Sequence, residues 1–121
     1  MTGLRVLVVE DDELIGMLLA EILTKAGYDV GTVEATEAGA VAAAASRRPG
    51  LMIVDIGLRN GSGFAAVEDI LRAGFIPHLF ISGDISEIRA LKPAAVVIQK
   101  PFREVDLARA IGQALAVTPS P

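Results

Sequence analysis

The sequence has no cysteine, no tryptophan and only one histidine, and its net charge is −4. The lack of cysteine excludes disulfide bonds and thiolate metal sites, and a single histidine excludes a multi-histidine metal cluster. An acidic chain lacks the basic footprint of a nucleic-acid-binding protein. No apolar run in the sequence approaches a membrane span, and the N-terminus lacks the pattern of a signal peptide. We therefore expect a cytoplasmic protein that binds no nucleic acid and does not insert into a membrane.

The chain has 121 residues, a length that suits one domain. A domain of this size buries roughly two-thirds of the surface that its unfolded chain exposes, so it needs no covalent staple. Hydrophobic residues make up 52% of the chain and aromatic residues only 4%, which fits buried strands covered by helices of small residues. We expect a single domain over residues 1–121, with residues 118–121 as a frayed tail.

Short apolar runs alternate five times with longer amphipathic stretches. Such runs, rich in valine and isoleucine, are typical of strands buried on both faces of a parallel sheet. We predict strands at residues 4–9, 29–33, 51–54, 78–81 and 95–98. We predict helices at residues 12–26, 36–47, 63–73, 86–91 and 104–117. This alternation favours right-handed crossovers and an α/β, flavodoxin-like, doubly wound sheet of five parallel strands in the order 2-1-3-4-5, with helices on both faces.

Two of the predicted helices carry an apolar stripe at helical spacing. The first stripe consists of Leu14, Ile15, Leu18, Leu19, Ile22 and Leu23. The second consists of Val105, Leu107, Ala108, Ile111, Ala114 and Leu115. We expect both stripes to pack into the core against the sheet.

Charged side chains come directly after three of the predicted strands. Glu10 and Asp11 follow the first strand, Asp55 the third and Lys100 the fifth. Sites in open parallel sheets form outside the carboxyl ends of the strands, and the first and third strands are neighbours in this order. We therefore expect the three carboxylates to converge. Clustered carboxylates repel one another unless they share a proton or a metal ion.

The turn after the first strand is acidic from Glu10 to Glu13, so it would repel a phosphate that arrived without a cation. A hard divalent cation fits better, because Mg²⁺ typically binds through one or two carboxylates, waters and a phosphate oxygen. Mn²⁺ can take its place. We assign Asp12 and Glu13 to the start of the following helix, where carboxylates are favoured, and leave them out of the metal site.

Asp55 suits a second role as well, because a carboxylate can attack phosphorus and form an aspartyl phosphate. Phosphoryl transfer requires in-line positioning and neutralisation of charge on the transferred oxygens. Lys100, a compact point charge, can neutralise one oxygen. The hydroxyl of Ser82, which follows the fourth predicted strand, can reach another.

Together these residues resemble the receiver domain of two-component response regulators. The motifs that carry the resemblance are Glu10-Asp11, Asp55, Ser82 and Lys100-Pro101-Phe102. The resemblance implies that Asp55 accepts a phosphoryl group from a sensor histidine kinase or a histidine phosphotransfer protein. Phosphorylation would then change binding to a downstream protein of unknown identity. The chain would be a switch and not an enzyme, apart from slow hydrolysis of its own phosphate.

The resemblance also implies roles for single residues. The ligands of Mg²⁺ would be Glu10, Asp11, Asp55 and the backbone carbonyl of Gly57. The Ser82 hydroxyl would move toward the phosphoryl group, and Lys100 would contact an oxygen of that group. The Lys100–Pro101 peptide bond would be cis, a form that proline makes accessible.

The sequence departs from the usual receiver pattern at two positions. Val97 stands where many receivers have an aromatic switch residue, and Arg59 stands where they often have proline. Phe80, two residues before Ser82, resembles a subgroup of stand-alone receivers without the aromatic switch. Because no DNA-binding or enzymatic output domain follows Pro121 in this sequence, we expect a single-domain regulator.

Three rival functions stay open at this point. The first is a pseudo-receiver, a protein-binding module of the same fold that never carries phosphate. The second is a small phosphatase with an aspartyl nucleophile, although Gly57 stands where such enzymes need a second acidic residue as general acid. The third is a flavin carrier, which the acidic turn disfavours.

Overall fold

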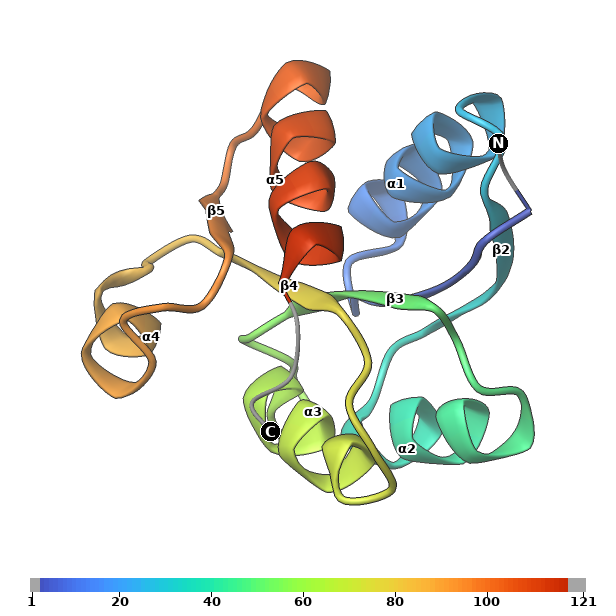
Figure 1. Ribbon diagram of the computed structural model, residues 1–121. Coiled ribbons are helices and arrows are strands. Elements are labelled where there is room, and N and C mark those ends of the chain that lie inside the picture. Colours follow the sequence, from blue (N-terminus) through green and yellow to red (C-terminus); the bar gives the residue numbers. More distant parts are fainter. Residues whose placement is uncertain (1–2, 118–121) are drawn as a thin grey trace.

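The computed structural model describes residues 3–117, which form a five-stranded parallel sheet with helices on both faces (Figure 1). In chain order the elements are β1 (Arg5–Val9), α1 (Glu13–Lys25), β2 (Asp29–Glu34), α2 (Glu37–Ser46), β3 (Leu51–Asp55), α3 (Gly63–Leu71), β4 (His78–Ser82), α4 (Ser86–Leu91), β5 (Val97–Gln99) and α5 (Glu104–Ala116). The strand order is β2-β1-β3-β4-β5, as predicted. The predicted tail at 118–121 lies outside the described residues. Within residues 3–117, no helix is both long and apolar enough to cross a membrane.

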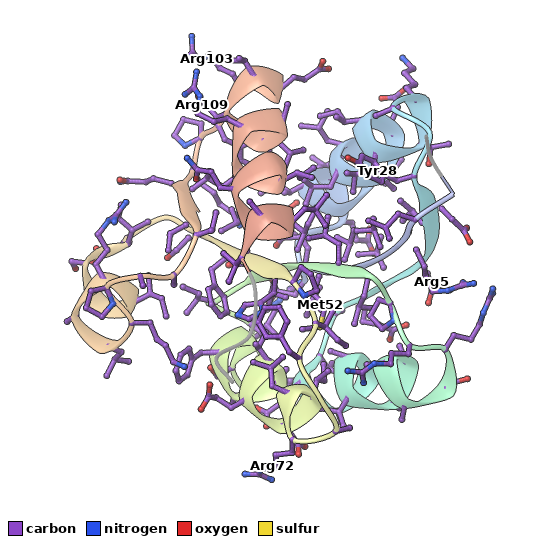
Figure 2. The ribbon with its side chains drawn as sticks, viewed as in Figure 1. Arg5, Tyr28, Met52, Arg72, Arg103 and Arg109 are labelled. Atoms are coloured by element: carbon purple, nitrogen blue, oxygen red, sulfur yellow. The ribbon has the colours of Figure 1, made fainter. Side chains whose placement is uncertain are left out.

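Alternate residues of the strands feed two separate cores. Helices α1 and α5 cover one face of the sheet, and α2 and α3 cover the other (Figure 1). Helix α4 lies out toward the β5 end of the sheet and contributes Ile88 to the core under α2 and α3. The core under α1 and α5 receives the strand residues Val6, Val8, Leu51, Ile53, Leu79 and Ile81. The opposite core receives Leu7, Val9, Met52, Val54 and Phe80. Figure 2 shows the Met52 side chain on the side of α2 and α3. Every residue of β3 is buried, so this strand is the centre of the fold.

The helices begin and end within two residues of the predicted bounds, and the first two are one residue shorter at each end. The reason is that the predicted terminal residues are caps. The Asp12 carboxylate accepts hydrogen bonds from the backbone N–H groups of Leu14 and Ile15, which satisfies two free donors at the start of α1. At the other end, Gly27 adopts a φ of 95°, the left-handed conformation that closes a helix and favours glycine.

The prediction that both apolar stripes are buried was wrong in part. The buried members of the stripes are Leu19, Leu23, Leu107, Ile111 and Ala114. The exposed members are Leu14, Leu18, Val105, Ala108 and Leu115, with Leu14 78% exposed. Each stripe is wider than the part of its helix that contacts the sheet, so its outer row of residues faces away from the core.

Strand β5 is shorter than predicted and begins later. The apolar run predicted a strand at 95–98, whereas the observed strand covers only Val97–Gln99 and is partly exposed at the edge of the sheet. The ladder toward β4 begins one residue earlier, because the N–H of Phe80 donates to the carbonyl of Val96 at 2.9 Å. Lys100 follows the last residue of β5 directly, at the carboxyl edge of the sheet.

A close approach between α3 and β3 generates the first testable prediction. A Cβ atom on Gly63 would collide with the backbone carbonyl of Asp55 and lie 2.7 Å from Cγ1 of Val54. We expect Gly63→Ala to lower the free energy of unfolding by about 3 kcal/mol, because the packed strand cannot move aside without strain. Urea denaturation followed by circular dichroism measures the change.

Gly112→Ala is the matched control. This glycine lies in the exposed part of α5 with no heavy atom within 4 Å of a built Cβ, so alanine should stabilise the protein by about 0.5–1 kcal/mol. Equal stability of the Gly63→Ala variant and the wild type would contradict the close packing of α3 on β3.

Candidate functional site

Three carboxylates meet at the carboxyl edge of the sheet. Val9 pairs with Val54 in the parallel ladder of β1 and β3, so the residues that follow them lie next to each other. Glu10, Asp11 and Asp55 each offer one carboxylate oxygen, and these oxygens all lie within 4.8 Å of one another. The convergence predicted from the strand ends is confirmed. Sequence reasoning put Asp55 after β3, whereas it is the last residue of that strand.

One lysine lies between two of these carboxylates. Nζ of Lys100 lies 3.0 Å from Oδ2 of Asp55 and 3.1 Å from Oε1 of Glu10. Both acids are buried, with Glu10 3% and Asp55 5% exposed. Burial disfavours the charged ammonium, but the hydrogen bond to Asp55 and the negative charge of the nearby Glu10 carboxylate outweigh it and raise the pKa of Lys100. One positive charge therefore faces two buried acids, and the Lys100–Pro101 peptide bond beside it is cis, as predicted.

Glu10 is the member of the cluster with a buried carboxylate oxygen that has no hydrogen-bond partner. Its Oε2 accepts a hydrogen bond from the backbone N–H of Asp12 at 3.1 Å. Its Oε1 is buried without a hydrogen-bond partner, although it forms an ion pair with Nζ of Lys100 at 3.1 Å. Burial, and next a hydrogen bond shared with Asp55, raise the pKa of Glu10 to about 7.

The cluster fits a hard divalent cation. A buried carboxylate oxygen without a hydrogen-bond donor, such as Oε1 of Glu10, is costly, and a metal ion would satisfy it. The available donors are carboxylate oxygens from three residues, the kind of ligand that Mg²⁺ and Mn²⁺ prefer, and no sulfur or imidazole group belongs to the cluster.

Asp11 has a partner that sequence reasoning did not find. The backbone N–H of Arg59 donates to Oδ2 of Asp11 at 2.6 Å, and Nε of the same arginine donates to that oxygen at 3.2 Å. Nη2 of Arg59 also donates to the backbone carbonyl of Asp11 at 2.6 Å. Desolvation opposes the ionised form, but the bonds from Arg59 hold the pKa of Asp11 below its usual value. The sequence feature that could have predicted this pair is an arginine in the loop after Asp55, at the same edge of the sheet as the acidic turn.

Ser82 and Gly57 lie at the edge of the cluster. The Ser82 hydroxyl donates to the backbone carbonyl of Asp84 at 2.8 Å and accepts a hydrogen bond from the N–H of the same residue at 3.1 Å. Its side chain therefore bonds to its own loop in this structure. The N–H of Gly57 donates to Oδ1 of Asp55 at 3.1 Å, so the predicted ligand residue lies beside the Asp55 carboxylate.

Val97, a small side chain, occupies the position where many receivers have an aromatic switch residue. Val97 is partly buried and packs against the core that contains Phe80 and Ile88. Phe80, which suggested the stand-alone subgroup, is 2% exposed, and its ring centroid lies 6.0 Å from that of Phe64. In this structure both side chains therefore belong to the core between the sheet and α2 and α3.

The fold and this arrangement of acids and lysine define a class of signalling domain. The profile of the response regulator receiver domain matches residues 6–112. The chain therefore belongs to the receiver domain family of two-component response regulators.

Particular relatives support this assignment. The phyllosphere-induced regulator PhyR of Methylorubrum extorquens is 37% identical over 115 residues, which cover 92% of this chain and 43% of PhyR. The chain therefore spans less than half the length of that relative. The chemotaxis protein CheY of Thermotoga maritima is 28% identical, with 92% of this chain and 97% of CheY covered. The solution structure of the receiver domain of Erythrobacter litoralis PhyR superposes with a TM-score of 0.87, at 35% identity over 100% of this chain and 96% of that one.

The raised pKa of Glu10 predicts how stability depends on pH without metal. The carboxyl has an ordinary pKa of 4.5 and titrates at about 7 in the folded chain, so folding favours its protonated form. The stabilisation is complete below pH 4.5 and is lost as the pH rises through about 7. Relative to Glu10→Gln, the wild type should lose about 3 kcal/mol of stability by about pH 8.

Urea denaturation in EDTA over a series of pH values measures this difference. Glu21→Gln is the control, because it replaces a carboxylate that is 63% exposed on α1 and should leave the pH dependence of the wild type in place. A constant difference between wild type and Glu10→Gln across the series would contradict the raised pKa.

Proposed function

We propose that this receiver domain is a phosphoacceptor, with Asp55 as the residue that carries the phosphoryl group. The observation that carries the proposal is the environment of Asp55. Its carboxylate is buried, its Oδ2 accepts a hydrogen bond from Nζ of Lys100 at 3.0 Å, and it shares a metal-binding geometry with Glu10 and Asp11. A carboxylate nucleophile beside a cation pocket is what formation of an aspartyl phosphate needs.

The proposed reaction transfers a phosphoryl group from a phosphohistidine. An oxygen of the Asp55 carboxylate forms a bond to phosphorus while the P–N bond of the donor breaks, and the released imidazole takes up a proton from solvent. Mg²⁺, when bound, would neutralise charge on the phosphoryl oxygens. Glu10, Asp11, Asp55 and the carbonyl of Gly57 would hold that ion.

Lys100 and Ser82 have separate tasks in this proposal. The Lys100 ammonium, already in contact with Asp55, neutralises a second phosphoryl oxygen. The Ser82 hydroxyl leaves its bonds to Asp84 and donates to a third oxygen. The segment from Ser82 to Asp84, between β4 and α4, thereby changes its conformation, which alters the surface near α4.

The partners follow from this chemistry. The phosphoryl donor is a sensor histidine kinase or a histidine phosphotransfer protein, and the output is a changed affinity for a downstream protein. We further propose that residues 1–121 act as one cytoplasmic receiver domain without catalytic output of their own. The match that covers 92% of this chain and 97% of CheY of Thermotoga maritima supports a single receiver domain over these residues.

Replacement of the acceptor tests the proposal directly. Incubation of the wild type with acetyl phosphate and Mg²⁺ should add one phosphoryl group, detected as a mass shift of the intact protein. Asp55→Asn should reduce this adduct to background, because an amide is not a competent nucleophile. Asp69→Asn is the matched control, since Asp69 lies on α3 in an exposed pair with Arg72 and should label like the wild type. An adduct of wild-type yield on Asp55→Asn would refute the assignment.

A pseudo-receiver is the second candidate, and one observation favours it. The carboxylates already have two cationic partners from the protein, Lys100 and Arg59, so the site is partly neutralised without metal.

Beryllofluoride with Mg²⁺ separates the two candidates, because it mimics a phosphoryl group on a competent carboxylate. A phosphoacceptor should show Mg²⁺-dependent amide shifts in NMR spectra around Asp55, Ser82 and Lys100. The Lys100→Ala variant should lose most of this response. A wild-type spectrum unchanged by beryllofluoride would favour the pseudo-receiver.

A further inference from the structure

Arg59 makes three hydrogen bonds to one residue of the acidic turn, 48 positions away in the sequence. Two of them end on Oδ2 of Asp11, and the third ends on the backbone carbonyl of Asp11. The two partners differ in exposure, because the Asp11 side chain is 13% exposed and the Arg59 side chain is 77% exposed. A solvent-exposed cation therefore neutralises a largely buried member of the carboxylate cluster.

The position of this pair conflicts with a bound metal ion. Asp11 is one of the three residues whose oxygens lie close enough to hold a cation. A guanidinium and a divalent ion on the same carboxylate repel each other, whichever of the two oxygens faces the metal. The carboxylate also has less electron density to donate while it accepts two hydrogen bonds from Arg59. Metal binding and the Arg59 pair are thus competing states of Asp11.

We infer that Arg59 is a built-in competitor of the metal ion, which occupies Asp11 in the metal-free protein and is displaced when a divalent cation binds. The inference rests on the proposed function, because it describes how metal access to the same site is set. Arg59 is a regulatory residue in this scheme, and it contributes no ligand to the metal.

The surrounding contacts confine the exchange to the side chain of Arg59. On one side of it, Leu58 is buried, with 8% exposure, and on the other side the N–H of Ser62 donates to Oε1 of Glu37 at 2.9 Å. The loop between β3 and α3 is therefore attached to the protein at both ends. The guanidinium is already largely in solvent, so it can leave Asp11 while the backbone N–H bond of Arg59 to that residue persists.

Competition between Arg59 and the metal ion would have two consequences. Because the metal ion must displace the Arg59 guanidinium, its affinity is lower than three carboxylates alone would give, and phosphorylation depends on the free concentration of the divalent ion. The released guanidinium also becomes an unpaired positive charge on the β3–α3 loop, beside the phosphorylation site. A binding partner can then distinguish the metal-loaded from the metal-free protein without an aromatic switch at Val97.

Direct titration with Mg²⁺ tests the inference. Isothermal titration calorimetry at fixed pH should show that Arg59→Ala binds Mg²⁺ about two- to fivefold more tightly than the wild type, the range expected for loss of an exposed ion pair. Arg72→Ala is the matched control, because it removes the same charge from a side chain of similar exposure, 79%, paired with Asp69. Figure 2 shows Arg72 pointing into solvent at the end of α3, on the far side of the fold from α1 and α5.

A second measurement follows the arginine itself. In ¹⁵N NMR spectra the Nε–H signal of Arg59, assigned by its loss in Arg59→Ala, should move toward the position of a solvent-exposed arginine as Mg²⁺ saturates the site. The Nε–H signal of Arg72 should stay in place. A signal of Arg59 that is unaffected by saturating Mg²⁺ would overturn the inference.

The outcomes separate this inference from the proposed function. Equal or weaker Mg²⁺ binding by Arg59→Ala, with normal labelling of the wild type by acetyl phosphate, overturns the competitor role and leaves Asp55 as the acceptor. Tighter binding by Arg59→Ala, with no labelling of any variant, supports the competitor role in a pseudo-receiver. Absence of Mg²⁺ binding in both proteins overturns the inference.

Discussion

Two buried acids that share one ammonium are the interaction on which the rest of this structure depends. Glu10 and Asp55 each lie within 3.1 Å of Nζ of Lys100, and neither carboxylate has access to bulk water that would screen it. One positive charge cannot neutralise two ionised acids, so the site must take up either a proton or a further cation. The raised pKa of Glu10 reflects the first alternative, uptake of a proton, and binding of a divalent ion is the second. The charges of the two acids are therefore balanced only when a proton or a divalent ion is bound.

The topology of the sheet brings the two acids and the lysine together. The acids and the lysine come from β1, β3 and β5, and the parallel order places all three carboxyl ends on one edge. The buried alternation of β1, β3 and β4 fixes their register, since a slip by one residue would exchange the two cores. The packing that holds Val54 in place thus also holds the backbone of Asp55, and Gly63 allows α3 to approach that backbone closely.

The sequence was informative wherever one local rule decided the structure. Apolar runs and caps predicted the strands and helices to within a few residues, and the strand ends predicted that Glu10, Asp11 and Asp55 meet. Prediction failed where the outcome depended on contacts between distant segments. The exposure of Leu14 follows from how α1 lies on the sheet, and the start of β5 from its pairing with β4, neither of which a hydrophobic pattern contains. The pair of Arg59 and Asp11 needs the path of a loop, which no propensity describes.

Two hydrogen bonds connect Lys100 and the end of β5 to Ser82 and the loop that follows it. The N–H of Lys100 donates to the carbonyl of Ser82 at 2.8 Å, and Nε2 of Gln99 donates to the carbonyl of Gly83 at 3.2 Å. Because β5 has only three residues, these bonds form a large part of what holds the lysine at the sheet edge. A shift of the Ser82 backbone would therefore also shift the backbone of Lys100, which couples the position of the ammonium to the conformation of the loop after β4.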